Sequence, residues 1–576
     1  MLKYLKPFRW GIALILLLLL TESMMALLLP AVMASIVNDG IIRGVLEDTP
    51  QTAYILQMGF VMLGITFMSG LAAVGAGFLS PRISAGAAMR LRRDLFVKVE
   101  SFSQKEFDSF SSASLITRCT NDITQVQNMA NMAARMLFFA PIMGIGGVIM
   151  ALSHSVAMSW VIALAVLVML GMILTITPIV TPRFRIMQGM MDTLNRVSRE
   201  ILHGLMVIRA FGTQEHERKR FDKSNRDIAD LNLFLTRVMA VIGPAMMFIM
   251  GGTQVLIVWV GGQHIAASGL QIGDMMAYMQ YAMQVVFSFM MLSMMFVMLP
   301  RAIVSAGRIV EVLETEPAIT DPDNSEDFVP GQEGIVSFND VCFSYPGAEV
   351  DALSDISFTA MPGQTTAIIG PTGAGKSTIA QLLLRFYDVT GGSITVNGTD
   401  IRKIKQTELR EGIGYVPQKG QLIAGTIASN IRYGRPAASD DEILQAAEVA
   451  QAVSIIEEKP EGLESEIGQK GGNVSGGQRQ RLSIARALAV NPKILVFDDS
   501  FSALDFQTDS KLRKALKDHA ANATVIVIAQ RVGTIRNAEQ ILVLEEGKIA
   551  GRGTHDELLE SCPAYYEIAS SQGVID

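Results

Sequence analysis

A glycine-rich segment in the second half of the chain, "GPTGAGKST" at residues 370–378, has the composition and spacing of a phosphate-binding loop. Small residues allow backbone N–H groups to close around phosphate oxygens, and the helix-like sequence that follows adds positive potential at its N-terminus. Lys376 can reach terminal phosphates, and the hydroxyl of Ser377 can bind Mg²⁺. The segment predicts a nucleotide and Mg²⁺ site that includes Gly370, Thr372, Gly373, Gly375, Lys376, Ser377 and Thr378.

A second segment, "ILVFDD" at residues 494–499, can supply carboxylates to the same site. Its four apolar residues predict a buried parallel strand, and the carboxyl ends of such strands are where open α/β sheets bind ligands. We interpret Asp498 as a Mg²⁺ partner. Apolar strands that end in aspartate are common, so this interpretation depends on the phosphate-binding loop that precedes it.

A third segment, "NVSGGQRQRLSIARAL" at residues 473–488, places a Ser-Gly-Gly turn before a basic helix. Such a turn exposes N–H groups at the start of the helix, where an anion can bind. The same sequence is typical of an ordinary N-capped helix, and the residues alone leave both interpretations open.

Apolar residues are concentrated before about residue 305, where six segments are long enough to cross a bilayer. Two stretches of more than 50 residues, 80–135 and 182–237, separate some of these spans and are rich in Lys and Arg. The positive-inside rule therefore places both stretches and both termini in the cytoplasm. Their helical pattern predicts that the membrane helices continue beyond the lipid. The spans lie near residues 11–37, 54–79, 136–153, 157–181, 238–262 and 275–300.

A linker at residues 315–334, rich in proline and acidic residues, separates a transmembrane domain (1–314) from a cytoplasmic domain (335–576). Strand-like and helix-like segments alternate in the second domain. The predicted fold is therefore a membrane α-helical bundle, six transmembrane helices with long cytoplasmic extensions, followed by an α/β P-loop nucleotide-binding domain. The net charge of −7 divides into a basic first part and an acidic second part, and nothing in it indicates a nucleic-acid partner.

The order of these motifs resembles the nucleotide-binding domain of ABC transporters, and the whole chain resembles an exporter half-transporter of that superfamily. The resemblance implies ATP and Mg²⁺ as cofactors, and a dimer in which two such domains enclose two ATP molecules. It implies that Tyr345 stacks on adenine, that Gln418 contacts Mg²⁺, and that Asp505 belongs to a loop linking the two sites. Residues 110–127 and 202–217 resemble coupling regions. The signature residues Ser475, Gly476, Gly477 and Gln478 would clamp the γ-phosphate of ATP held by the opposite subunit.

Two positions depart from the family pattern in ways that bear on hydrolysis. The family has Glu after the strand-end Asp, whereas this chain has Asp499. The loss of one methylene withdraws the carboxylate by about 1.5 Å, and a misplacement on that scale can slow catalysis on the order of 10²-fold. The switch histidine is replaced by Gln530, whose amide cannot carry a proton. We hypothesise that this site binds ATP but hydrolyses it poorly, in a heterodimer with a second ABC half-transporter that keeps Glu and His. A homodimer of slow sites and a regulatory ATP-binding subunit remain alternatives.

Polar residues within the spans indicate where a substrate could bind. Glu22 lies in the middle of the first span, where it can attract a cation or form an interhelical hydrogen bond, and Gln280 and Gln284 lie four residues apart in the sixth. The last two spans are rich in methionine, which suits either a chemically tolerant cavity or a lipid-facing surface. We expect a lipophilic compound or drug as the substrate, with lipid or peptide export as alternatives, in contact with the lipid of a bacterial plasma membrane.

Overall fold

The computed structural model describes residues 2–49, 51–267 and 269–574, with the backbone alone at residues 2, 134, 294, 296–298 and 300. The chain forms two compact units. The first contains Met1–Glu100 and Ala113–Thr315, and the second contains Ser101–Ser112 and Glu316–Asp576. The second unit is therefore assembled from two separate segments of the chain.

Six helical stretches in the described residues are long and apolar enough to cross a membrane, and each overlaps one of the predicted spans. The expectation of a six-helix membrane region is confirmed. The stretches are Lys6–Leu46, Thr52–Glu100, Ser112–His154, Val156–His203, Gln214–Ala266 and Ile272–Ser293. The first comprises the 3-10 helix η2 (Lys6–Phe8), α1 (Arg9–Ser35), the π-helical turn η3 (Ile36–Ile42) and α2 (Arg43–Leu46). The third comprises α5 (Ser112–Thr117), the π-helical turn η4 (Arg118–Asp122), α6 (Ile123–Ala134), the π-helical turn η5 (Arg135–Phe139) and α7 (Ala140–His154).

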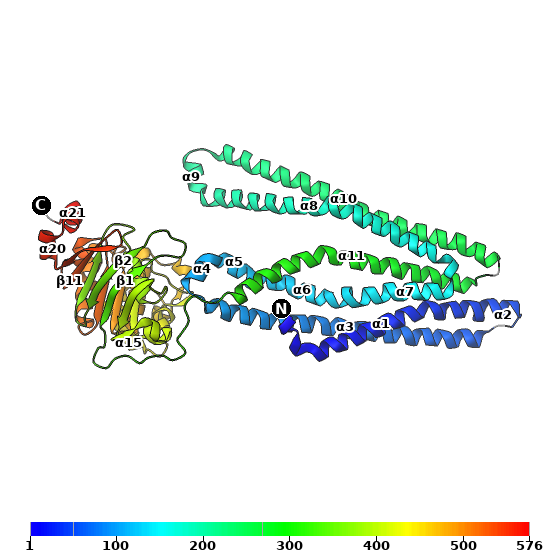
Figure 1. Ribbon diagram of the computed structural model, residues 1–576, viewed down its shortest axis with the longest axis horizontal. Coiled ribbons are helices and arrows are strands. Elements are labelled where there is room, and N and C mark those ends of the chain that lie inside the picture. Colours follow the sequence, from blue (N-terminus) through cyan, green and yellow to red (C-terminus); the bar gives the residue numbers. More distant parts are fainter. Residues whose placement is uncertain (1, 50, 268, 575–576) are drawn as a thin grey trace. The chain divides into compact units, whose positions relative to one another are not determined.

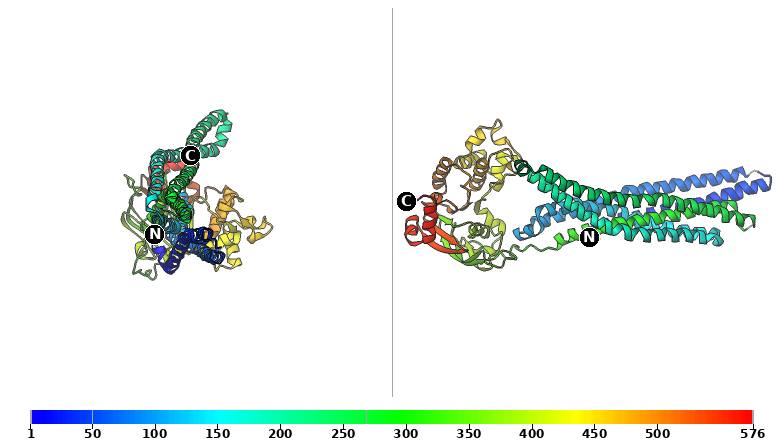
Figure 2. Two further views of the ribbon diagram at one scale, coloured as in Figure 1. Left: turned by 90° about the vertical axis from the view of Figure 1, so that its right-hand side faces the viewer. Right: turned by 90° about the horizontal axis from the view of Figure 1, so that it is seen from above.

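Four helices are much longer than a bilayer is thick. They are α3 (Thr52–Glu100), α8 (Ser159–His203), α10 (Gln214–Ala266) and α11 (Ile272–Glu314), with 49, 45, 53 and 43 residues. At 1.5 Å per residue they extend roughly 65–80 Å, against about 30 Å of hydrocarbon. The predicted continuation beyond the lipid is confirmed. The short helix α9 (Leu205–Ala210) connects α8 to α10, which pack side by side (Figures 1 and 2).

Hydrogen bonds and buried aromatic rings join α11 to α1. Tyr278 and Tyr281 of α11 are fully buried, and the hydroxyl of Tyr281 donates to the carbonyl oxygen of Leu27 at 3.0 Å. The side-chain amide of Gln284 donates to the carbonyl oxygen of Ala26 at 3.1 Å. Because an unsatisfied polar group in a bilayer is costly, these bonds fix which face of α11 is turned toward α1.

The second unit is built around a six-stranded sheet of order β12-β11-β3-β10-β9-β6, in which only β12 is antiparallel to its neighbour. Its strands are β3 (Thr365–Ile369), β6 (Ile413–Val416), β9 (Ile494–Asp498), β10 (Thr524–Ile528), β11 (Gln540–Glu545) and β12 (Lys548–Gly553). An antiparallel sheet of order β2-β1-β4-β5 contains β1 (Val336–Phe343), β2 (Leu353–Ala360), β4 (Gly391–Val396) and β5 (Thr399–Asp400). The short strands β7 (Gly425–Thr426) and β8 (Glu466–Ile467) pair with each other.

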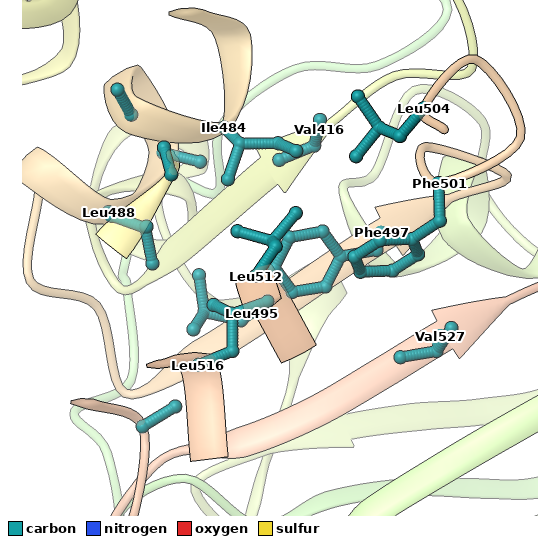
Figure 3. Close-up of a cluster of buried hydrophobic side chains, with 14 of the residues drawn as sticks. Val416, Ile484, Leu488, Leu495, Phe497, Phe501, Leu504, Leu512, Leu516 and Val527 are labelled. Atoms are coloured by element: carbon teal, nitrogen blue, oxygen red, sulfur yellow. The ribbon is translucent and has the colours of Figure 1, made fainter. Parts of the chain in front are cut away.

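Helices cover the six-stranded sheet and complete its hydrophobic core. Every residue of β9 is buried, as expected for a central parallel strand. Figure 3 shows Phe497 of β9 beside Leu512 of α18, with Ile484 of α17 above them. The predicted α/β domain is confirmed. Its helices are α4 (Gln104–Phe110), α12 (Lys376–Leu383), α13 (Gln406–Glu411), α14 (Ile427–Ile431), α15 (Asp440–Val449), α16 (Val453–Glu457), α17 (Gly476–Ala489), α18 (Phe506–His519), α19 (Val532–Ile535), α20 (His555–Ser561) and α21 (Pro563–Ser571).

Candidate nucleotide-binding site

The carboxyl ends of four parallel strands bring predicted site residues to one edge of the six-stranded sheet. β3 leads into the phosphate-binding loop, and β9 ends at Asp498. β6 and β10 each end two residues before a predicted glutamine, Gln418 and Gln530 respectively. Because parallel strands share the edge at which they end, residues far apart in the sequence lie together there.

The phosphate-binding loop turns tightly from β3 into α12. Gly375, the N-cap of α12, has a φ of +92°, in the left-handed region that favours glycine. A side chain at Gly370 would come within 2.1 Å of the carbonyl oxygen of Leu544. The Nζ atom of Lys376 donates to the carbonyl oxygens of Gly370 and Pro371 at 2.8 and 2.7 Å, which holds the amino group over the loop. Of the other predicted loop residues, Thr372 and Gly373 are exposed and Thr378 is buried.

A hydroxyl and a carboxylate lie together at the start of α12. Ser377 Oγ donates to Asp498 Oδ1 at 2.8 Å, and Asp498 is only 4% exposed. Burial raises the pKa of Asp498, and the hydrogen bond from Ser377 opposes that change. Mg²⁺ prefers oxygen ligands of these kinds, so the two side chains fit a Mg²⁺ ion bound with nucleotide phosphates.

Asp499 lies between two glutamine side chains. Its Oδ2 accepts hydrogen bonds from Gln530 Nε2 at 2.9 Å and from Gln418 Nε2 at 3.2 Å. Asp499 has a φ of +47°, and its backbone N–H donates to the carbonyl oxygen of Ile528 at 2.8 Å. Burial raises the pKa of Asp499, whereas the bond from Gln418 and the charge of Lys376 lower it. The structure therefore brings the three predicted hydrolysis-related residues into one hydrogen-bonded group.

The charge of Lys376 is held in a poorly solvated position. The residue is 9% exposed, and burial lowers the pKa of its ammonium group, while Asp499 and Asp498 act in the opposite direction. A cation that has lost much of its hydration gains more from an anionic ligand than an exposed one does. The site is therefore suited to bind the negative charge of phosphate groups.

Tyr345 lies beside α12, as part of an aromatic group. Its hydroxyl donates to Gln381 Oε1 at 3.1 Å and is 3.0 Å from Thr378 Oγ1. The ring is half-buried and packs edge-on against Phe343 and Tyr387, with centroid separations of 4.9 and 5.4 Å. These contacts place Tyr345 beside α12; the resemblance to ABC transporters implies that its ring stacks on adenine.

The signature residues lie on an exposed surface away from the loop. Ser475 caps α17, since its Oγ accepts from Gln478 N at 3.2 Å, and both Ser475 and Gly476 are exposed. Asp505 caps α18, because Oδ1 accepts from Thr508 N at 2.9 Å, and this lowers the pKa of Asp505. Within the described parts of the chain, none of these residues hydrogen-bonds to the phosphate-binding loop.

The membrane unit contains a cavity of about 330 Å³ between η5, α7, α10 and α11. Gln284 lines it, and the Oε1 atom of this residue is buried without a hydrogen-bond partner among the described residues. Gln280 is exposed, and neither Gln280 nor Glu22 belongs to the lining. Instead, Glu22 interacts electrostatically with Arg135. The lining includes the methionines Met143, Met246, Met250, Met283, Met290 and Met291.

Two groups of contacts in the second unit were not predicted from the sequence. Asp108 of α4 accepts a hydrogen bond from the hydroxyl of Tyr387 at 2.8 Å, just before the predicted coupling region at residues 110–127. Burial and Asp108 both raise the pKa of Tyr387. Near the end of the second segment, Gln572 contacts the loop that carries Gln530. A capping sequence at Ser103 could have indicated α4, but no sequence signal indicates these partners.

Comparison with known proteins agrees with this architecture. Residues 12–289 match the family model of the ABC transporter transmembrane region, and residues 353–502 match that of the ABC transporter. An uncharacterised ABC transporter ATP-binding protein of Mycobacterium tuberculosis is 40% identical over 575 residues, which cover 99% of this chain and 97% of that protein. A fatty acid ABC transporter ATP-binding/permease protein of Mycobacterium bovis is 34% identical over 485 residues, covering 83% and 75%. The solved structure of a bacterial Atm1-family ABC exporter with ATP bound covers 98% of both chains, with a TM-score of 0.79 and 27% identity.

The fold and the matched regions define a multi-pass membrane protein with a fused ATPase domain. The chain belongs to the ABC transporter family, as an exporter half-transporter whose membrane and ATP-binding domains share one polypeptide. It is accordingly an ATPase that drives export, and ABC exporters act as dimers.

Proposed function

We propose that this chain is one subunit of a heterodimeric exporter and that its own ATP site binds ATP but hydrolyses it poorly. The observation that carries the proposal is the environment of Asp499, whose Oδ2 accepts hydrogen bonds from the amides of Gln418 and Gln530 at 3.2 and 2.9 Å. Both neighbours are neutral donors that cannot take up a proton. The Asp499 carboxylate is therefore hydrogen-bonded to two amides, and neither amide can assist it in removing a proton from water.

The backbone at Asp499 gives its carboxylate little room to reach the position that a glutamate carboxylate would occupy. Its carboxylate is one methylene shorter than that of glutamate, and a misplacement of about 1 Å can cost on the order of 10²-fold in rate. The bond from its N–H to Ile528 fixes the backbone at the end of β9. The side chain therefore has little freedom to extend toward a water molecule that a glutamate would reach.

ATP binding depends on other residues than ATP hydrolysis does. In this proposal Lys376 holds phosphate groups, while Ser377 and Asp498 hold Mg²⁺. Bound ATP supplies the phosphoanhydride whose hydrolysis drives transport. This chain keeps all three of these residues although positions 499 and 530 depart from the family pattern, which supports tight nucleotide binding with slow turnover.

The partner in this proposal is a second half-transporter with Glu and His at the corresponding positions. The signature, Ser475 to Gln478, makes no hydrogen bond to the phosphate-binding loop among the described residues, and in this proposal it completes the partner's site. Asp505, exposed at the start of α18, would lie at the same interface. A homodimer with two slow sites is the alternative.

The double substitution Asp499→Glu with Gln530→His tests the proposal in the purified full-length complex in lipid nanodiscs. We expect ATP hydrolysis to rise on the order of 10-fold or more, because a longer carboxylate and an imidazole restore proton transfer. The matched control Asp518→Glu with Gln364→His makes the same chemical changes at exposed positions and should leave the rate unchanged. An unchanged rate in the double variant would show that positions 499 and 530 do not limit hydrolysis.

We also infer that the transported compound is lipophilic and carries a hydrogen-bond donor. The methionine-lined cavity of about 330 Å³ lies within the size range of small-molecule sites, and its flexible side chains suit varied apolar shapes. Gln284 lines the cavity, and in this proposal its Oε1, which is buried without a hydrogen-bond partner among the described residues, is the acceptor for the compound. The relative named as a fatty acid transporter supports a lipophile, and export of a membrane lipid is the nearest alternative.

Gln284→Leu tests the substrate proposal, with Gln280→Leu as the matched control on the same helix. We expect Gln284→Leu to weaken stimulation of ATPase activity by a lipophilic alcohol about fivefold in apparent affinity, with no effect on its methyl ether. Gln280→Leu should change neither, because Gln280 lies outside the cavity lining. Equal effects of the two variants would contradict the proposed site.

A further inference from the structure

The residue that directly follows α21, Gln572, contacts the loop that carries Gln530. Tyr565 and Ala569 of α21 are fully buried in the core, and the hydroxyl of Tyr565 lies 2.8 Å from His555 Nδ1. These contacts fix the helix, so that Gln572, which follows it directly, has a defined position.

The side-chain amide of Gln572 forms two hydrogen bonds with backbone groups on either side of Arg531. Its Oε1 accepts from Val532 N at 2.8 Å, and its Nε2 donates to Gln530 O at 2.8 Å. Val532 is the first residue of α19, and its N-cap, Arg531, makes no side-chain cap bond. Gln572 therefore caps this helix from a distant part of the chain.

These bonds continue into the ATP site. The loop leaves β10 after Ile528, and Ala529 N donates to Ile368 O at 3.0 Å. Beyond that point Gln572 holds the backbone, while the Gln530 side chain extends to Asp499 Oδ2 at 2.9 Å. The direction of the Gln530 side chain therefore depends on a residue outside all the recognised motifs.

We propose that Gln572 is a positioning residue that holds Gln530 in the direction needed to contact the γ-phosphate of ATP. The proposal rests on the proposed function: Gln530 stands where the family has its switch histidine, beside Asp499 in the ATP site, and in this proposal its amide donates to the γ-phosphate. The proposed contact is available to ATP but not to ADP, because ADP lacks the γ-phosphate. Gln572 should contribute to the preference of this site for ATP over ADP and leave ADP binding unchanged.

The test uses the full-length complex in nanodiscs with Gln572→Ala, Gln572→Glu and the control Ser571→Ala. Dissociation constants for ATP and ADP with Mg²⁺ are measured at this chain's site by photo-cross-linking of azido-nucleotides, and hydrogen exchange is measured at residues 529–535. Gln572 is exposed, so its removal leaves no cavity. Glutamate keeps the acceptor for Val532 N and loses the donor to Gln530 O. Among the described residues, the hydrogen bond of Ser571 Oγ is to Ile568 O within α21.

We expect Gln572→Ala to weaken ATP binding about three- to tenfold, with ADP binding unchanged and exchange at Val532 faster by about fivefold or more. Gln572→Glu should keep Val532 protected but still weaken ATP binding, and Ser571→Ala should change neither. Unchanged or parallel ATP and ADP affinities in Gln572→Ala would overturn the proposal. The dissociation constants and the hydrogen exchange do not depend on the rate of ATP hydrolysis. If the double variant Asp499→Glu with Gln530→His fails to raise hydrolysis, the proposed role of Gln572 is therefore not contradicted.

Discussion

Lys376 and Asp499 show how the same small region can favour binding and disfavour turnover. Burial lowers the pKa of Lys376, and the neighbouring carboxylates act against that change. Bonds from Lys376 to two loop carbonyls keep its ammonium group over the phosphate-binding loop. Asp499, in contrast, is hydrogen-bonded to two amides. The site therefore has a positive charge that can bind phosphate. Among the described residues, however, the Asp499 carboxylate is hydrogen-bonded to no titratable side chain that could help it to accept a proton.

Replacement of Lys376 by alanine tests the binding half of this interpretation. We expect the affinity of this chain's site for ATP to fall on the order of 10- to 100-fold, because hydrogen bonds to a charged group are lost. Photo-cross-linking of azido-ATP to this chain, compared with its partner, measures the change. Lys403→Ala, which removes an exposed lysine paired with Glu326, is the control and should bind normally. Equal labelling of the Lys376 variant and the unmodified chain would contradict the assignment.

Motif spacing could locate residues that are close in sequence or lie at the ends of neighbouring strands. Parallel pairing of β6, β9 and β10 is enough to bring Gln418, Asp499 and Gln530 together. The contact from Gln572 could not be predicted, because it depends on how α21 packs after the sheet has formed. Likewise, Gln280 and Gln284 are equivalent in sequence spacing, and only the packing of α11 against α1 distinguishes them.

At the scale of elements, α20 and α21 are joined by a buried histidine. His555 Nδ1 and the hydroxyl of Tyr565 are 2.8 Å apart, and both residues are buried. Burial and the charge of Arg536 lower the pKa of His555 below its ordinary value of 6.5. Below pH 6.5 the unfolded chain therefore binds a proton that the folded chain does not, and stability is lost progressively as the pH falls.

Acidification should therefore loosen α20 and α21 before it affects the rest of the unit. Cys562, which is 4% exposed between these helices, can report the opening through its rate of maleimide labelling. We expect the labelling rate of the unmodified chain, divided by that of His555→Asn at the same pH, to rise several-fold between pH 7.5 and 5.5. Comparison at equal pH removes the intrinsic dependence of thiol reactivity. A constant ratio would exclude His555 as the cause.

The lengths of the helices were predictable, while their internal irregularities were not. A continuous polar helical pattern beyond the apolar spans was sufficient to indicate α3, α8 and α10 as extended elements. The π-helical turns η3, η4 and η5 have no sequence signature of their own. They reflect tertiary packing, which adds one residue to a turn where neighbouring helices require it.

At the scale of the whole molecule, the proposal makes a prediction about subunit composition. A chain with a slow ATP site needs a partner with a fast one for efficient transport. We expect native mass spectrometry of the tagged, gently extracted complex to show this chain and a second half-transporter in a one-to-one ratio. The second chain should carry Glu and His where this one has Asp499 and Gln530. Two copies of this chain alone would mean that both sites are impaired.

The second compact unit also has a consequence for recombination and protein engineering. Residues 101–112 belong to it, and Asp108 and Glu106 accept bonds from Tyr387 and from the backbone of Ala318. A fragment cut at residue 316 would leave those two donors without their carboxylate partners. Chimeras that exchange ATP-binding domains between relatives should therefore transplant residues 101–112 as well, because the boundary of the folded unit does not coincide with any single cut in the gene.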